Sequence, residues 1–267
     1  ADDDLPVRNI MDSNIAAVTT LNDQEEVAAL FNECDLPVIP VVDRENRLVG
    51  VVMFDDAMEI MEEEATEDME IMGGMSPSEK NYIRSSVFDL FRQRIPWLML
   101  LMISATFTGM IITGFETALA AQVALTAFIP MLMDTGGNSG SQSSVTVIRA
   151  ISLGEIKFSD LPMVLWKELR TAVLCGASLS AVCFLKIILI DRMLLGNDGI
   201  TLAVAAVVCF TLIITVFLAK SVGAVLPLAA SRMGFDPAVM SSPFITTIVD
   251  ALSLLVYFET AKILLGL

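Results

Sequence analysis

The first part of the chain alternates short apolar runs with polar segments. The run at 23–31 has the spacing of a helix, and Asn22 or Asp23 supplies a side chain suited to its N-cap. Shorter apolar runs bounded by polar turns predict three strands, at 15–18, 37–42 and 48–53. We therefore expect a small α/β module over residues 1–56.

Two helices are predicted to follow, over residues 57–94. Apolar residues recur at helical spacing from Asp55 up to the break at Gly73 and Gly74, and acidic residues fill the other face. A second, amphipathic helix is predicted over 78–95.

Beyond residue 95 the apolar runs are long enough to cross a bilayer. We expect five spans, at roughly 95–115, 117–148, 165–190, 200–226 and 239–266. The predicted fold is an α-helical polytopic membrane protein with five transmembrane helices over 95–267. A small α/β module and an acidic connecting helix precede them.

Composition agrees with a membrane protein and points to cations as partners. The chain is 55% hydrophobic, and residues 1–80 hold 21 acidic and 4 basic side chains, a net charge of −17. Such a charge repels nucleic acid and anionic lipid, so nucleic-acid binding is excluded and divalent cations are the natural partners. A merely solubilising acidic face is the alternative. Because the chain contains no His, carboxylate and carbonyl ligands suited to Mg²⁺ or Ca²⁺ are expected rather than a zinc site.

Basic residues predict how the chain crosses the cell membrane. The turn between spans one and two holds only one charged residue, Glu116. Basic residues precede the first span, at Arg84, Arg92 and Arg94, and cluster between the second and third spans, at Arg149, Lys157, Lys167 and Arg170. Because basic residues favour the cytoplasmic side, we expect a cytoplasmic N-terminus and an extracytoplasmic C-terminus.

A polar, glycine-rich run at 130–144 interrupts the second predicted span. Lipid does not tolerate exposed polar backbone, so we expect the glycines to loosen or break the helix where it lines a water-filled path. The candidate pore-lining residues of this run are Gly136, Gly137, Asn138 and Gln142, with Ser139 and Ser141 as further oxygen donors. A helix-packing seam of the Gly-x-x-x-Gly kind, Gly136 to Gly140, is the alternative.

Asp134 adds a carboxylate to this run, and we expect it to be buried. An ion contact and an N-cap for a helix restarting at the glycines are the two interpretations. Asp134 is therefore a candidate metal ligand of lower weight than Asp250.

Asp250 is the strongest candidate for function. It lies eleven residues into the last apolar span, about 16 Å deep at a rise of 1.5 Å per residue, where an ionised carboxylate is costly. Ser242 and Thr246 precede it at intervals of four, which predicts a polar stripe on one helical face. The alternative is a structural carboxylate paired with Lys186 or Lys220. Since one carboxylate is few for a divalent ion, a symmetric homodimer that brings two Asp250 side chains across a central path is expected.

Several motifs resemble the MgtE family of Mg²⁺ channels and transporters. They include a start typical of a cystathionine-β-synthase (CBS) domain at 23–28, further matches at 35–56 and 63–68, the Thr-Gly-Gly-Asn-Ser-Gly-Ser-Gln-Ser run at 135–143, and Pro243 followed by Thr247 and Asp250. The resemblance implies a homodimeric Mg²⁺ channel with spans two and five lining the pore. In it, Asp250 would be the ion-binding aspartate, Thr246 would offer a backbone carbonyl, and Ser242 would stand at the constriction.

The resemblance also implies gating by intracellular Mg²⁺. The helix over 57–72 would be a plug that closes the cytoplasmic mouth when Mg²⁺ binds the acidic region. The regulatory acidic residues would be Asp55, Asp56, Glu59, Glu62, Glu63, Glu64, Glu67 and Asp68. ATP is a further partner that CBS modules suggest, through Asp56.

The chain departs from the family pattern at three points. It has one CBS module where the family has two and an N-terminal domain, so we expect a truncated chain. Ser242 replaces the common Asn, and Met53 replaces the hydroxyl residue of the nucleotide signature, which weakens the case for ATP.

Two other functions are weighed against a Mg²⁺ channel. One is a secondary transporter of another divalent cation, such as Co²⁺ or Mn²⁺, coupled to Na⁺ or H⁺. The other is a membrane-anchored regulator that senses nucleotide. An enzyme is not expected, because the sequence shows no nucleophile and base pair and no phosphate-binding loop.

Overall fold

The computed structural model describes residues 6, 9, 11, 15–34, 36–78, 80–197, 199–240 and 242–266, with the side chains of 32 and 33 excepted. Most of residues 1–14 of the predicted CBS-like module, and position 35 of its motif, therefore lie outside the described residues. Contacts divide the chain into two compact units, Ala1–Glu67 and Asp68–Leu267.

The first unit contains a small sheet with one helix packed on it. In the described part of the chain the strands are β1 (Val18–Thr19), β2 (Val38–Val42) and β3 (Leu48–Met53), and the sheet order is β1-β2-β3. β1 runs parallel to β2, and β3 runs antiparallel to it. Helix α1 (Gln24–Cys34) provides the crossover between the parallel pair. Each of these elements overlaps the strand or helix that the hydrophobic pattern predicts there.

The core of this unit is small and contains residues from strands β1 and β2, from helix α1 and from the acidic helix that follows β3. Val18, Val27, Phe31, Ile39 and Ala57 form one buried cluster. Asp23 accepts a hydrogen bond of 3.0 Å from the Glu25 backbone N–H, as an N-cap does. Of the two N-cap candidates, Asp23 therefore makes this contact.

Helix α2 (Phe54–Met72) begins directly after β3 and ends at Gly73 and Gly74, as predicted. Gly74 has a positive φ of 70°, a conformation that glycine adopts without strain and that ends helices. Ala57 is the buried residue of α2, and the exposed surface of the helix carries most of its acidic side chains together with Phe54, Met58 and Met69.

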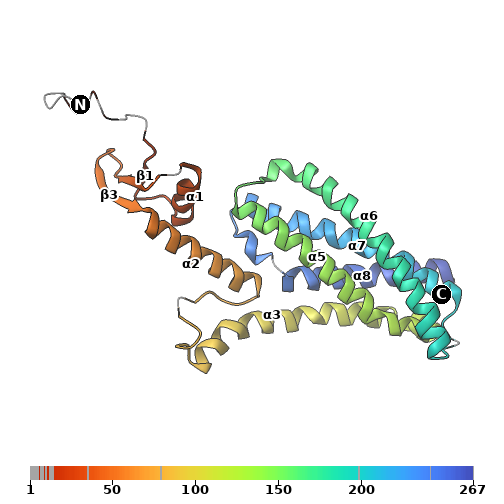
Figure 1. Cartoon of the computed structure of the whole chain (residues 1–267). Coiled ribbons are helices and arrows are strands. Elements are labelled where there is room, and N and C mark those ends of the chain that lie inside the picture. Colours follow the sequence, from red (N-terminus) through yellow and green to blue (C-terminus); the bar gives the residue numbers. More distant parts are fainter. Residues whose placement is uncertain are drawn as a thin grey trace. The chain divides into compact units, whose positions relative to one another are not determined.

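The second unit is helical (Figure 1). Its helices are α3 (Val87–Gly114), α4 (Glu116–Ala121), α5 (Ile129–Ser152), α6 (Leu161–Lys186), α7 (Leu202–Arg232) and α8 (Ser242–Leu265). Tighter 3₁₀ turns cover Val123–Phe128, Phe158–Asp160 and Pro237–Val239, and α6 continues into a π-helical segment, η4 (Ile187–Leu194).

Helices α5 to α8 form the packed bundle. α7 packs against α5, α6 and α8, and α5 also packs against α8. Sixteen of the described residues of α7 are buried, because the helix is apolar around most of its circumference and lies against three neighbours. Helix α3 contacts α8, and none of its described residues is buried.

The glycine-rich run does not break its helix. α5 continues without interruption from Ile129 to Ser152, and the change of backbone conformation lies upstream, in the 3₁₀ turn Val123–Phe128. The prediction of a break at the glycines is therefore wrong. Glycine lowers helix propensity by only about 1 kcal/mol, which the packing of this face against two helices offsets.

The predicted amphipathic helix over 78–95 is also different in the structure. Ser86 caps a helix that starts at Val87 and runs through Pro96 to Gly114, with Asp89 completing the capping box. The segment before it forms turns, so the connecting helix and the first span are one helix.

Three of the described helical segments are long and apolar enough to cross a membrane: Val87–Gly114, Phe158–Leu194 and Leu202–Arg232. α5 and α8 have 24 residues each and contain the polar residues of the predicted site. The structure thus supports several apolar spans in the second unit.

Candidate functional site

One face of α5 exposes a row of polar side chains. Asp134, Asn138 and Gln142 follow one another at intervals of four residues and are all exposed in the isolated chain. The amide of Asn138 donates a hydrogen bond of 3.0 Å to Asp134 Oδ1. We call these three residues the α5 polar row.

Asp134 differs from the prediction in its burial and in its position along the helix. It is exposed rather than buried, and it lies inside α5 rather than at the N-cap of a helix. The expectation of a buried carboxylate and the N-cap interpretation are therefore wrong for the single chain, because α5 does not restart at the glycines.

The opposite face of α5 carries the glycines, which permit close packing. A Cβ atom at Gly136 would lie 2.7 Å from Thr215 Cγ2 and 2.9 Å from Ser253 Oγ, and one at Gly140 would lie 2.8 Å from Ile245 Cγ2. Real Cβ atoms do not approach so closely, so larger residues at these positions would push α7 and α8 away. Gly136 and Gly140 are buried and form the packing seam that the alternative interpretation predicted.

Ser242, Thr246 and Asp250 lie along the side of α8 that approaches α5. A Cβ atom at Gly137 would be 3.0 Å from Thr246 Cγ2 and 3.7 Å from Asp250 Oδ1. One turn further along, Ser242 Oγ donates a hydrogen bond of 2.9 Å to Ser141 Oγ. All three side chains are half-buried, and we call them the α8 stripe.

The start of α8 is held by its own side chains. Both Thr246 Oγ1 and Thr247 Oγ1 donate to the Pro243 carbonyl, at 2.9 Å and 3.0 Å. This carbonyl therefore already accepts two hydrogen bonds. The role of the Thr246 carbonyl as an ion ligand stays a prediction.

Asp250 is not part of a structural ion pair. Lys186 pairs with Asp191 at 2.8 Å, and Lys220 lies 3.8 Å from Glu168. Both candidate partners are thus engaged elsewhere, and within the described part of the chain Asp250 forms neither a salt bridge nor a hydrogen bond. Asp134 lies one helical turn before Gly137, the α5 residue that the Asp250 side chain approaches.

Two like charges at one site attract a cation but do not complete a metal centre. No group of three or more His, Cys, Asp or Glu side chains with metal-binding geometry occurs among the described residues. Two carboxylates with neighbouring hydroxyl and amide groups suit a hydrated Mg²⁺, which keeps most of its water, better than a dehydrated ion.

The acidic residues on α2 form a second feature of the chain. The helix contains no basic residue between Phe54 and Met72, and most of its carboxylates are exposed. Glu64 accepts a hydrogen bond of 2.6 Å from the Gln24 side chain, and Asp68 accepts one from Ser152. Asp56, the candidate nucleotide contact, accepts a hydrogen bond of 3.3 Å from the backbone of Met53.

The sequence interpretation missed a buried polar network behind the α5 polar row. Ser143 on α5, Glu168 on α6 and Lys220 on α7 lie within hydrogen-bonding or ion-pairing distance of one another. A signal was available, because Glu168 and Lys220 are ionisable residues inside apolar spans and such residues need partners.

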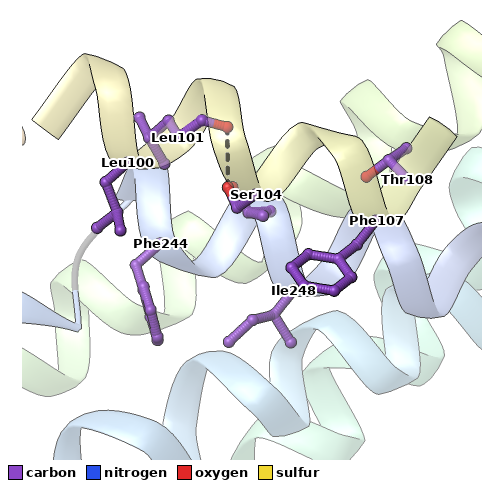
Figure 2. A pocket seen from close by; sticks show the side chains of 8 residues that line it. Leu100, Leu101, Ser104, Phe107, Thr108, Phe244 and Ile248 are labelled. Atoms are coloured by element: carbon purple, nitrogen blue, oxygen red, sulfur yellow. Dashed lines mark hydrogen bonds between the residues drawn. The ribbon is translucent and has the colours of Figure 1, made fainter. Parts of the chain in front are cut away.

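Helices α3 and α8 also line a partly open, apolar cavity of about 290 Å³ (Figure 2). Its lining includes Leu100, Phe107, Phe244 and Ile248, with no charged side chain. This cavity lies on a different side of α8 from the stripe and belongs to an apolar interface between helices.

Fold and site together define the class of protein. A helical membrane domain that carries polar side chains on two of its helices follows a small α/β module, and the two parts match two family profiles. The CBS domain profile matches residues 7–63, and the MgtE profile, described as a divalent cation transporter, matches residues 129–260. The chain belongs to the MgtE family, as its motifs suggested.

Three relatives named Magnesium transporter MgtE resemble nearly the whole chain. The Thermus thermophilus protein is 37% identical over 265 residues, which is 99% of this chain and 57% of the relative. The Bacillus subtilis protein is 35% identical over 96% of this chain and 54% of the relative, and the Enterococcus faecalis protein is 29% identical over 98% and 55%. The chain spans a little over half the length of these relatives.

Proposed function

We propose that this chain forms the membrane domain and adjoining CBS module of a homodimeric Mg²⁺ channel or transporter. Its ion path runs between copies along the α5 polar row and the α8 stripe. The family membership and the name shared by the three relatives support Mg²⁺ as the transported ion.

The observation that carries this proposal is the exposure of the α5 polar row. A carboxylate, an amide and a second amide on one face of a membrane helix are costly against lipid, because hydrocarbon offers them no hydrogen bonds. They therefore require either water or protein outside the isolated chain. An aqueous path between two copies supplies both.

A two-fold axis beside α5 and α8 completes the site. Each chain contributes Asp134 and Asp250, so a symmetric pair places four carboxylates around one path. These carboxylates act on Mg²⁺ through its waters, since the ion dehydrates reluctantly and a single chain offers too few ligands to replace them. The hydroxyl groups of Ser242 and Thr246 extend the polar surface along the path.

Five spans and a cytoplasmic N-terminus complete the proposed arrangement. The spans are α3, α5 with the turn before it, α6 with η4, α7, and α8. The loop between α5 and α6 is basic, as a cytoplasmic loop is, and in the proposed arrangement α2 is on the same, cytoplasmic side of the membrane. The membrane is the cell membrane.

The acidic region provides the regulation. Mg²⁺ that accumulates in the cytoplasm screens the repulsion among the α2 carboxylates and favours the state in which this region closes the path. The eight acidic residues from Asp55 to Asp68 are the proposed sites, with α2 as the plug.

The test is flux of Mg²⁺ into proteoliposomes that contain the purified chain. We expect Asp250→Asn and Asp250→Ala to abolish flux while elution as a folded dimer persists, and Asp134→Asn to reduce it. Glu259→Gln, which removes an exposed carboxylate near the other end of the same helix, is the matched control and should retain flux. Normal flux in both Asp250 variants would contradict the proposed path.

The same vesicles separate the proposed function from coupled transport of another metal. Flux of Mg²⁺, Ca²⁺, Mn²⁺ and Co²⁺ is compared with and without an imposed Na⁺ or H⁺ gradient. A channel for Mg²⁺ shows selectivity for that ion and no requirement for either gradient. Dependence on a gradient would instead identify a secondary transporter.

A further inference from the structure

Behind the α5 polar row lies a buried network of charged and polar side chains that comes from three helices. Ser143 Oγ donates a hydrogen bond of 2.6 Å to Glu168 Oε2 and accepts one of 3.2 Å from Lys220 Nζ. Lys220 Nζ lies 3.8 Å from the same Glu168 oxygen. The Ser143 hydroxyl thus uses both its donor and its acceptor capacity to join α6 and α7.

This network is strongly buried for charged groups. Lys220 is 5% exposed and Ser143 is 2% exposed, and the Glu168 side chain is 15% exposed. Charges removed from water are costly unless they are paired, so each member depends on the other two. A buried polar network whose members satisfy one another has little freedom to rearrange.

The network lies beside the closest approach of α5 and α7. A Cβ atom on Gly223 would overlap the Gly140 carbonyl oxygen and would lie 3.1 Å from Ser143 Cβ. Glycine therefore allows the two backbones to touch, but such a contact alone does not resist rotation of a helix about its axis. A directional bond from Ser143 to two neighbouring helices does.

We propose that Glu168 and Lys220 are positioning residues that set the rotation of α5 through Ser143, and so direct Gln142 and Asn138 into the ion path. Ser143 is the neighbour of Gln142, and consecutive residues on a helix are about 100° apart. Holding Ser143 against α6 and α7 therefore turns Gln142 outward. The inference rests on the proposed function, because the direction matters only if the α5 polar row lines the path.

The experiment measures how fast a small cationic methanethiosulfonate reagent labels a cysteine at position 142. Gln142→Cys is placed in the chain with its cysteines at 34, 175, 183 and 209 replaced by alanine, and the protein is reconstituted in vesicles. Network variants are then added: Ser143→Ala, Lys220→Arg, and the double variant Glu168→Gln with Lys220→Met. The double variant removes both charges together, which avoids an unpaired buried charge and favours a folded product.

We expect position 142 to be labelled when the network is intact and when Lys220→Arg keeps its charge. Ser143→Ala and the double variant should slow labelling by about tenfold, the change that about 1.4 kcal/mol produces in an equilibrium constant. The matched control is Asp191→Asn, which breaks the ion pair between Asp191 in η4 and Lys186 at the end of α6, and should not change labelling.

The outcomes distinguish this inference from the function on which it rests. If labelling is rapid with the intact network and equally rapid in Ser143→Ala and in the double variant, the positioning role alone is overturned. No labelling of position 142 with the intact network would overturn the proposed path, and the positioning role with it. An equal loss in Asp191→Asn would show a general effect of bundle stability and would also overturn the positioning role.

Discussion

Ser242 on α8 and Ser141 on α5 share a hydrogen bond of 2.9 Å between their hydroxyl groups, 101 residues apart in the chain. Ser141 in turn donates to the carbonyl of Gly137 in its own helix, at 2.9 Å. The α8 stripe is thereby joined to the glycine-rich segment of α5. This contact makes the two helices a single structural unit at the point where the site begins.

The first prediction concerns this hydroxyl pair. Ser141→Ala and Ser242→Ala should each lower the free energy of unfolding by about 0.5 to 1.5 kcal/mol, the usual contribution of a hydrogen bond. The double variant should cost less than the sum of the two, because both remove the same bond. Thermal unfolding of the four proteins of this double-mutant cycle in detergent is the measurement. Full additivity would mean that the two hydroxyl groups do not interact.

The second prediction concerns the packing seam on α5. Gly136→Ala should destabilise the bundle by about 1 to 3 kcal/mol, because the added methyl group has no room beside Thr215 and Ser253. Gly109→Ala is the matched control. That glycine lies inside α3 with no neighbouring atom within 4 Å of an added Cβ, so alanine there should be neutral or stabilising. The melting temperatures of the two variants in the same detergent provide the comparison, and equal effects would contradict the seam.

The third prediction concerns the turn after α2. Gly74 has a φ of 70°, and a Cβ atom there would overlap the indole ring of Trp97 and lie 3.2 Å from Pro243 Cγ. Gly154→Ala is a close control, because its φ is 69° and an added Cβ would meet nothing. Both variants incur about 1 to 2 kcal/mol of backbone strain, and only Gly74→Ala adds a clash. Gly74→Ala should therefore lower the melting temperature further, whereas equal shifts would show that the contact with Trp97 contributes nothing.

The fourth prediction concerns the acidic helix. Mg²⁺ should protect α2 from proteolysis, because it screens the repulsion among carboxylates that have no basic neighbour on the helix. Changing Glu59, Glu62 and Glu63 to Gln should raise the Mg²⁺ concentration needed for protection severalfold. The control removes the same number of charges from exposed positions in the second unit, with Glu116, Glu155 and Glu259 changed to Gln. An equal effect in the control would assign the protection to overall charge rather than to α2.

Local patterns predicted the first unit and the end of α2 well, because these features depend on neighbours in the chain. The strands β2 and β3 lie within one residue of the apolar runs that indicated them, and Gly73 and Gly74 end α2 as a glycine pair does. The predictions failed where distant helices decide the backbone. Glycine propensity suggested a break in α5, whereas α7 and α8 pack against the glycines and keep the helix intact.

The site divides in the same way. The spacing of Ser242, Thr246 and Asp250 was sufficient to place them on one face, since helical periodicity is a local property. The spacing could not predict that these side chains approach Gly137, because that contact depends on how α8 packs against α5. The engagement of Lys220 by Glu168 likewise required the relative positions of α6 and α7, whereas Lys186 pairs with Asp191 only five residues further along the chain. Together these two pairs leave Asp250 without an ion-pair partner among the described residues.

The sequence by itself determined that this is a membrane protein with an acidic region, which residues carry polar chemistry into the apolar spans, and through its motifs the MgtE family. These properties follow from composition, charge and the spacing of apolar residues, all of which can be read directly from the sequence. The tertiary structure decided which polar residues meet. It gave α5 one face for packing and one for polar exposure, and it placed Ser143, Glu168 and Lys220 in one buried network. Such contacts depend on the rotation and separation of whole helices, which no local stretch of sequence specifies.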